Sequence, residues 1–343
     1  MNIGILGFAH GHVHCYVSRW RERQELGISV VCGWDHDRTR LADAAAKHEI
    51  RTCQSAADVV QDRSVDAVVI ASETALHADL VELAAAVRKP IVLQKPLAVS
   101  MAQADRIVEA VESTGVPFTI AWQMRTDPQN TAMREMARNG SLGRIFLVRR
   151  RHCLPTHQWP WIRGSWHVNP RLNRDIWADD AAHAVDFIYW LLGMPVSVTA
   201  EIASLLDPSI PMDNGIAIFR FPDGAIAEVV CSFVCEAGEN TTEITAEKGM
   251  IVQNYGDGPS CSMPRAPNAT GLKWHINGSQ GWTESPIPSP NNHGERIFGL
   301  AGPLAEFLHG KRPPIATARE GRDVLRMILA CYESSEKGIR VML

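Results

Sequence analysis

Several features that mark membrane, secreted or nucleic-acid-binding proteins are missing from this sequence of 343 residues. No uncharged apolar run approaches the ~18 residues that a membrane-spanning helix requires. The chain begins on the apolar segment Asn2–Leu6, without the basic segment and long apolar run of a secretory signal. Charged residues form no long run of one sign, and the formal net charge of −4 disfavours a nucleic-acid partner. We therefore expect a cytoplasmic protein that binds neither membrane nor nucleic acid.

The sequence also lacks a Cys-x-x-Cys pair, because its eight cysteines are scattered. The closest two, Cys231 and Cys235, would only share one face of a strand. Free buried thiols are the usual state in a chain of this size, and they suit a reducing cytoplasm.

The N-terminal third has the pattern of a doubly wound parallel sheet, in which short apolar runs alternate with helical segments. The length of the chain is enough for two domains of ordinary size. The predicted strands are Asn2–Leu6, Ser29–Trp34, 65–71, 91–94 and 118–121, and the predicted helices are 41–48, 75–87 and 101–113.

The pattern changes after a predicted linking helix, Pro128–Arg138. Longer strands follow, and the hairpin sequence Asp223-Gly224 joins two of them, which indicates an antiparallel or mixed sheet. These strands are predicted at 144–151, 196–203, 215–221, 225–234 and 243–245, followed by irregular loop or strand edge at 256–290 and helices at 295–308 and 321–337.

Lys95 ends a short apolar run, Ile91 to Gln94, and is followed by Pro96. Such a run is typical of a buried parallel strand that stops abruptly. Ligands of open α/β sheets bind beyond the carboxyl ends of the strands, so this strand is expected to deliver an ammonium group to a ligand site. A surface lysine at a strand end is the ordinary alternative.

The turn after the first strand, from Gly7 to His12, is a degraded form of the Gly-x-Gly-x-x-Gly dinucleotide fingerprint. Only Gly7 is in place, because Ala9 and His12 stand at the second and third glycine positions and Gly11 lies one residue early.

Asp35 closes the second predicted strand, 23 residues after His12. A carboxylate at this spacing is placed to accept the ribose hydroxyls of NAD, and it would repel the 2′-phosphate of NADP. Arg38 and Arg40 follow closely and could soften this preference. The alternative is that Asp35 and Asp37 cap the next helix.

His10, His12 and His14 alternate along the start of a helix, where 3.6-residue periodicity separates them. No carboxylate or cysteine lies at a helpful spacing, so we predict no metal site. These imidazoles are expected to line the cofactor cleft or cap the helix.

A helix predicted from Asp179 to Gly193 is apolar on most of its surface. At ~100° per residue, Asp179, His183, Asp186 and Trp190 fall on one stripe. A helix of this kind is mostly buried, and buried ionisable groups need partners. The stripe therefore faces either a structural polar network or a polar ligand.

These residues fit the oxidation of an alcohol with NAD, which removes a hydride from carbon and a proton from oxygen. An imidazole ordinarily titrates near neutral pH, which suits His183 to accept the proton. Lys95 could hydrogen-bond the substrate oxygen, or act as the base itself. Asp179 could bind substrate hydroxyls or hold the imidazole.

Four tryptophans, at positions 159, 161, 166 and 177, precede this helix, with His157, Arg163 and His167 among them. Indole faces beside polar groups suit a sugar-like ligand, although a subunit contact or a minor core would have the same composition.

Taken together, these motifs resemble the glucose–fructose oxidoreductase, inositol dehydrogenase and MocA family (Gfo/Idh/MocA) along nearly the whole chain. The most specific matches are Gln94-Lys95-Pro96 and the Asp-x-x-x-His-x-x-Asp spacing of Asp179, His183 and Asp186. Weaker matches are the turn at Gly7, the strand 66–71 with His77, Arg125 and the segment 141–145. Gln94 stands where the family usually has glutamate, and 173–177 replaces a glycine-rich approach, so a reshaped substrate pocket is expected.

The resemblance implies an α/β Rossmann domain at 1–121, a doubly wound parallel sheet that binds NAD(P). It also implies an α+β domain at 122–343 with a large, mostly antiparallel sheet for substrate binding and oligomerisation. Homodimers or homotetramers through that sheet are expected. The implied catalytic residues are Lys95, Asp179 and His183, and the expected substrate contacts are Trp161, Arg163, Trp166, Asp179 and His183. The expected NAD contacts, with NADP not excluded, are Gly7, Phe8, Ala9, His10, Gly11, His12, Asp35, Arg38, Ser72, His77, Gln94 and Lys95.

The leading hypothesis is an NAD(P)-dependent dehydrogenase or reductase that transfers a hydride between a nicotinamide cofactor and a sugar, cyclitol or related polyol. Two alternatives use the same scaffold: a non-catalytic nucleotide-binding regulator, and an enzyme that uses NAD transiently for elimination or glycoside cleavage. The joint presence of Lys95, Asp179 and His183 speaks against the regulator, because a sensor needs none of them.

Overall fold

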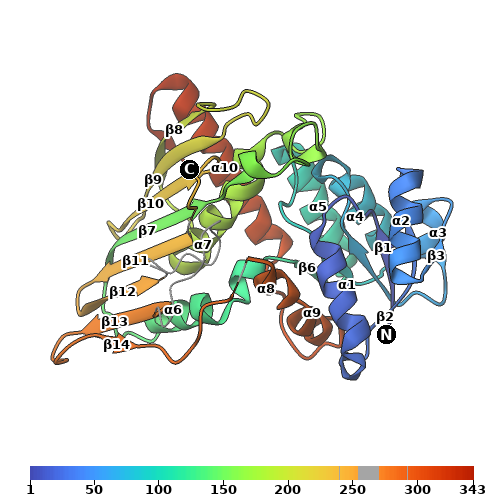
Figure 1. Cartoon of the computed structure of the whole chain (residues 1–343), viewed down its shortest axis with the longest axis horizontal. Helices are drawn as coiled ribbons and strands as arrows, with labels where there is room; N and C mark the ends of the chain where they lie inside the picture. Colours follow the sequence, from blue (N-terminus) through green and yellow to red (C-terminus); the bar gives the residue numbers. More distant parts are fainter. Residues whose placement is uncertain (239, 254–269, 292) are drawn as a thin grey trace. The chain divides into compact units, whose positions relative to one another are not determined.

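The computed structural model describes residues 1–238, 240–253, 270–291 and 293–343, which form two compact units, each with its own sheet (Figure 1). Unit 1 comprises Met1–Thr126, Arg171–Asn173 and Arg296–Leu325, and unit 2 comprises Asp127–Pro170, Arg174–Glu295 and Arg326–Leu343. The short segment 171–173 joins unit 1 through the Ala75 N–H, which donates to the Leu172 carbonyl at 2.8 Å.

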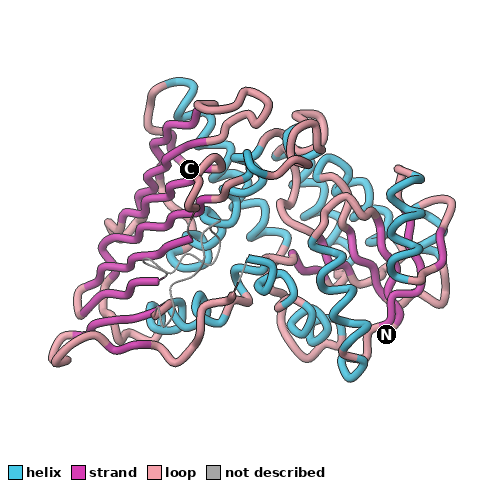
Figure 2. Tube along the Cα trace, viewed as in Figure 1, coloured by secondary structure: helices cyan, strands magenta, loops and turns pink. Residues whose placement is uncertain are grey.

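Unit 1 contains a six-stranded parallel sheet in the order β3-β2-β1-β4-β5-β6. Figure 2 draws the strands in magenta and the helices in cyan. The strands are β1 (Asn2–Leu6), β2 (Ser29–Trp34), β3 (Arg51–Thr52), β4 (Ala67–Ile70), β5 (Ile91–Leu93) and β6 (Phe118–Ile120). This is the Rossmann order, which reverses between β1 and β4, and ligands of such sheets bind beyond the carboxyl ends at that point. The predicted doubly wound sheet is confirmed.

The central strands of this sheet are buried on both faces, which explains why continuous apolar runs predicted them. The five predicted strands agree with the structure to within two residues. The two-residue strand β3 was not predicted, because its residues are exposed and carry no apolar pattern.

Helices alternate with the strands of this sheet along the chain, and several of them begin at a side-chain N-cap. Asp37 accepts hydrogen bonds from the N–H groups of Thr39 and Arg40, and Ser100 accepts one from Gln103. The helices of the described chain that contribute to unit 1 are α1 (His12–Glu22), α2 (Arg38–His48), α3 (Ala56–Gln61), α4 (His77–Ala86), α5 (Met101–Thr114), α8 (His293–Phe298), α9 (Ala301–Leu308) and the first part of α10 (Ala318–Lys337). The sequence did not predict α3.

Unit 2 contains a nine-stranded sheet in the order β14-β13-β12-β11-β7-β10-β9-β8-β15. Only the pair β7 and β10 is parallel among the pairings described, so the predicted mostly antiparallel sheet is confirmed. The strands are β7 (Ile145–Cys153), β8 (Ser197–Ala203), β9 (Asn214–Arg220), β10 (Ile226–Ser232), β11 (Asn240–Ala246), β12 (Gly249–Gln253), β13 (Leu272–Ile276), β14 (Thr283–Glu284) and β15 (Val341–Met342).

The predicted Asp-Gly hairpin joins β9 to β10. Gly224 has a φ of 90°, and the Phe221 N–H donates to the Ala225 carbonyl at 2.9 Å across the turn. The segment 256–290, predicted as irregular loop or strand edge, supplies β13 and β14 at one edge of the sheet, where β13 pairs with β12 over five residues. Residues 285–290 are irregular, and the part from 256 to 269 lies outside the described residues.

The two faces of the large sheet differ in composition. Helix α7 (Ala182–Leu192) packs against β7 and β10 and buries Val148, Arg150 and His152 on the inner face. The outer face exposes Ile216 and Ile218. The predicted linking helix, α6 (Pro128–Arg138), has the expected bounds and begins at the cap Asp127.

Candidate active site

The turn that follows β1 is held between the ends of two neighbouring strands. The Gly7 N–H donates to the Trp34 carbonyl of β2 at 2.7 Å, and the His10 N–H donates to the Ala71 carbonyl after β4 at 2.9 Å. Gly7 has a φ of 87°, and an added Cβ would lie 2.5 Å from the Ser72 Cα. Only glycine fits this position without displacing the neighbouring backbone.

The N-terminus of α1 is suited to an anion. Gly11 is the N-cap residue, no side chain caps the helix, and the first turn carries no acidic residue. An added Cβ on Gly11 would meet nothing within 4 Å, so the backbone there is open to a ligand. The positive end of the helix dipole favours phosphate groups, so this turn fits a pyrophosphate despite its degraded fingerprint. Beside it, the His10 and His12 rings lie 4.3 Å apart, and Ala9 is partly exposed.

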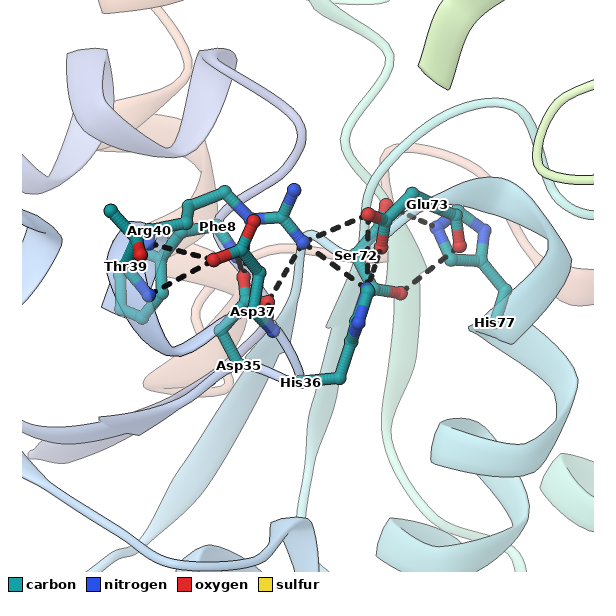
Figure 3. Close-up of polar contacts among 9 residues, drawn as sticks. All are labelled: Phe8, Asp35, His36, Asp37, Thr39, Arg40, Ser72, Glu73 and His77. Carbon is teal, nitrogen blue, oxygen red and sulfur yellow. Dashed lines mark hydrogen bonds and ion pairs between the residues drawn. The ribbon is translucent and has the colours of Figure 1, made fainter. Parts of the chain in front are cut away.

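Asp35 follows β2 and is 0% exposed, with both carboxylate oxygens occupied by protein donors (Figure 3). One oxygen accepts from the Phe8 N–H at 2.7 Å and from Arg40 Nε at 2.7 Å. The other accepts from the Asp37 N–H at 2.8 Å and from Arg40 Nη2 at 2.7 Å. A carboxylate has about four lone-pair sites, so a ribose hydroxyl could reach Asp35 only by displacing one of these donors.

Arg40 also contacts the end of β4. Its Nη2 donates to Glu73 Oε1 at 2.8 Å, and the His36 Nε2 lies 3.0 Å from each Glu73 oxygen. Arg38, predicted to contact the cofactor, is exposed and donates to the Gln54 carbonyl instead. The cation beside Asp35 is therefore Arg40.

His77 connects the end of β4 to the chain after Lys95. Its Nδ1 donates to the Pro96 carbonyl at 3.0 Å and lies 3.2 Å from the Leu97 carbonyl, while Nε2 lies 3.4 Å from the Ser72 carbonyl. Burial lowers the pKa of His77 to about 4, so the ring is neutral at physiological pH. His77 thus holds the backbone that follows Lys95.

Lys95 lies two residues beyond the end of β5 and is 2% exposed. The preceding Gln94 is buried and its Nε2 donates to the Tyr16 hydroxyl at 3.1 Å. Gln94 therefore makes a contact inside unit 1 with α1.

We expect acid to destabilise unit 1 through His77. An imidazole whose pKa is lower in the folded chain than the ordinary 6.5 leaves the unfolded chain with more bound protons between the two values. The free energy of unfolding is then fully present above pH 6.5 and falls as the pH falls toward 4. The expected loss from His77 is about 2 kcal/mol at pH 5, with His14 and His48, whose pKa values burial also lowers to about 4, acting in the same direction.

Urea unfolding at pH 7 and pH 5 would measure this effect. His77→Gln should be less stable than the wild type at pH 7 but should lose less stability on going to pH 5. An equal loss in both proteins would show that His77 is not the source.

In unit 2, a π-helical turn, Trp177–Ala181, precedes α7 and carries Asp179. Asp175 begins it by accepting the Ala178 N–H at 3.0 Å, and the Tyr332 hydroxyl donates to the same carboxylate. Trp177 packs against Gly215 of β9, where an added Cβ would lie 2.4 Å from the indole ring. Such π-helical turns are frequent at functional sites because they redirect side chains within a helix.

The predicted catalytic stripe is buried, but its partners differ from the expectation. Asp179 pairs with His167, whose Nδ1 lies 2.6 Å from Asp179 Oδ2. His183 has Asp180 Oδ1 at 3.7 Å from its Nε2, and its ring centroid lies 5.3 Å from that of His152 on β7. Asp179 therefore does hold an imidazole, but it is that of His167.

The predicted aromatic cluster forms around His167. The Trp166 ring stacks on the imidazole with centroids 3.9 Å apart, and the Trp161 ring meets it edge-on at 5.5 Å. Trp161 is exposed, and the Trp159 ring stacks on it at 5.5 Å. Arg163 points elsewhere and pairs with Asp207 at 2.8 Å.

Five side chains that are not among the predicted catalytic, cofactor or substrate contacts lie beside predicted site residues in the structure. These are His36, Arg40 and Glu73 in unit 1, and His152 and His167 in unit 2. Arg40 and His167 were visible as charged or polar neighbours of predicted residues. The other three depend on strand order and register. In the described part of the chain, no group of three or more His, Cys, Asp or Glu side chains is arranged to hold a metal ion.

The chain matches two family models. One, described as an oxidoreductase family with an NAD-binding Rossmann fold, matches residues 1–121, and the other, the GFO/IDH/MocA C-terminal domain, matches residues 130–252. An inositol 2-dehydrogenase from Saccharopolyspora erythraea is 28% identical over 263 residues, which cover 73% of this chain and 72% of that protein. A D-apiose dehydrogenase from Rhizobium rhizogenes is 26% identical over an alignment of 352 residues, covering 98% and 94%.

The solved structures that resemble this chain share its fold. A levoglucosan dehydrogenase in complex with NADH and levoglucosan superposes with a TM-score of 0.84 at 19% identity, covering 100% of this chain and 99% of that one. An Agrobacterium radiobacter oxidoreductase in complex with NAD+, L-tartaric acid and magnesium gives a TM-score of 0.82 at 20% identity, covering 100% and 98%. With both family models matched in chain order, this chain belongs to the Gfo/Idh/MocA family of NAD-binding oxidoreductases.

Proposed function

We propose that this enzyme is a dehydrogenase that oxidises a secondary alcohol of a sugar, cyclitol or related polyol. The observation on which this proposal rests is that Asp179, His183 and Asp186 are all buried on one helical segment whose other side chains, apart from Asp180, are mostly apolar. Burying ionisable groups costs free energy, and a role in binding a polar substrate would account for their presence here. The relatives named inositol, D-apiose and levoglucosan dehydrogenases support a polyhydroxylated substrate.

Bound NAD supplies the hydride acceptor. In unit 1, the open N-terminus of α1 at Gly11 would bind the pyrophosphate, and the end of β2 at Asp35 would face the adenosine ribose. The protein's own task is to remove the proton that remains on the alcohol oxygen.

We assign three residues to that task. Lys95 donates a hydrogen bond to the alcohol oxygen and stabilises negative charge that develops on it. His183 accepts the hydroxyl proton. Asp179 accepts a hydrogen bond from a neighbouring substrate hydroxyl or fixes His167, to which it is already bonded, beside the substrate. The exposed Trp161 offers an indole face to the apolar side of a sugar ring.

The substrate class can be tested with a panel of sugars and cyclitols, each offered with NAD and with NADP. Growth of absorbance at the reduced-nicotinamide band would identify a substrate. If no polyol produces reduced cofactor while the protein retains bound nicotinamide, net dehydrogenation is not its reaction.

The outer face of the unit 2 sheet is proposed as the interface of a homodimer or homotetramer. Ile216 and Ile218 project from β9 on this face, and Leu147 is exposed on β7. Beside them, Arg149 pairs with Glu228 at 2.7 Å and with Glu243 at 3.4 Å. An exposed apolar patch beside a charged rim is the usual composition of a subunit contact.

We expect Ile218→Lys to convert the oligomer to monomer, because a symmetric contact brings each substituted residue into the interface twice. Light scattering coupled to size-exclusion chromatography would measure the mass. Leu206→Lys is the matched control, because Leu206 is equally apolar and exposed but lies in the loop between β8 and β9. A wild-type monomer, or an Ile218→Lys variant with unchanged mass, would contradict the proposed interface.

A further inference from the structure

Glu73 is a buried carboxylate that the proposed reaction does not use. It follows β4, its side chain is 3% exposed, and its contacts are Arg40 and His36 (Figure 3). Burying a carboxylate costs free energy unless the group is paired. Glu73 is paired with Arg40, which also donates hydrogen bonds to Asp35. The end of β2 and the end of β4 are thus joined through one guanidinium.

The carboxylates of Asp35 and Glu73 use only some of the N–H donors of Arg40. Its Nε and Nη2 donate to Asp35, and Nη2 also donates to Glu73. Its Nη1 makes no hydrogen bond to any described residue, and the side chain is 25% exposed. A guanidinium has five N–H donors, so Arg40 retains donors for a ligand anion.

We propose that Glu73 is a specificity-determining residue that biases the site toward NAD and against NADP, by controlling Arg40. This inference rests on the proposed position of the adenosine ribose at Asp35. A ribose diol that binds Asp35 must displace one of its donors, and Arg40 is its side-chain donor whereas the others are backbone N–H groups. Glu73 gives the displaced guanidinium a second anion to pair with. A 2′-phosphate would instead need Arg40 for itself, and Glu73 competes with the phosphate for it.

The charges support the same direction. Asp35, Glu73 and Arg40 together carry one net negative charge, which opposes a 2′-phosphate. Without the Glu73 charge the cluster is neutral and Arg40 has donors directed at the ligand. Removal of this charge should therefore strengthen NADP binding and weaken NAD binding.

The test is Glu73→Gln, which keeps the side-chain shape and removes the charge. Isothermal titration calorimetry would give dissociation constants for NAD and NADP, and for AMP and adenosine 2′,5′-bisphosphate as probes of the ribose end alone. We expect the preference for the 2′-phosphorylated member of each pair to rise about tenfold or more over the wild type. Glu82→Gln is the matched control, because Glu82 also pairs with an arginine, Arg106, on the surface of α4. This control should leave unchanged the preference for NADP over NAD and for adenosine 2′,5′-bisphosphate over AMP.

A second variant establishes the route through Arg40. Arg40→Gln should shift the preference the other way, toward NAD, and in that background Glu73→Gln should give little further change. The inference would be overturned if the NADP-to-NAD preference of Glu73→Gln stayed within twofold of the wild type. It would also be overturned if Glu73→Gln raised that preference equally in the Arg40→Gln background. If Glu73→Gln fails to fold, an Arg40→Gln variant whose preference does not shift toward NAD would still overturn the inference. Failure of wild-type protein to bind AMP or NAD would instead refute the proposed ribose position, and the inference with it.

Discussion

Lys95→Ala is expected to lower kcat by about 10³-fold or more and to leave the dissociation constant of NAD within a few-fold. Lys95 follows the carboxyl end of β5, the edge of the sheet where ligands of this fold bind, and the residue is 2% exposed. A positioned donor to a developing alkoxide acts in the transition state, so its loss lowers kcat and kcat/KM together. A loss of 10³ corresponds to about 4 kcal/mol, which is a common magnitude for such a donor.

Two further variants control for shape and position. Lys95→Met keeps most of the side-chain volume, so equal losses in the alanine and methionine variants would assign the effect to the ammonium group. Lys89→Ala removes a lysine that precedes the same strand, where it donates to the Asp62 carbonyl at 3.1 Å, and it should retain activity within a few-fold. Turnover that survives in Lys95→Met would exclude Lys95 from the reaction.

The architecture was predictable from the sequence where one local pattern determined it. Strands β4 and β5 were found because continuous apolar runs mark strands buried on both faces, and the hairpin at Gly224 was found because its φ of 90° favours glycine. Helix α3 and strand β3 were missed because they are short, and β13 was hidden by a Gly- and Pro-rich setting.

The site was harder to predict, because its contacts depend on register and strand order. Arg38 and Arg40 look equivalent in the sequence, yet residues two apart on a helix point in nearly opposite directions. Arg38 therefore reaches the Gln54 carbonyl, while Arg40 turns back to Asp35. Glu73 contacts Arg40 only because of the strand order. In the sheet, β1 alone lies between β2 and β4, which places the ends of those two strands close together.

The same limit applies in unit 2. The i, i+4 spacing of Asp179 and His183 correctly placed both on one buried helical segment. Spacing could not reveal His167, because its imidazole reaches Asp179 from a preceding loop rather than along the helix. Two imidazoles therefore compete for the role of proton acceptor, and kinetics can separate them.

We expect His183→Asn to lower kcat/KM by 10²- to 10⁴-fold, the usual contribution of a general base. If His183 accepts the proton, the wild-type activity falls on the acid side as its imidazole becomes protonated, and this limb disappears in the variant. His167→Asn should keep the limb, because it removes only the group that fixes Asp179. Chemical rescue gives an independent measurement: added imidazole should restore part of the activity of His183→Gly and none of that of His167→Gly. An acid limb that vanishes in His167→Asn and persists in His183→Asn would reassign the proton to the His167–Asp179 pair.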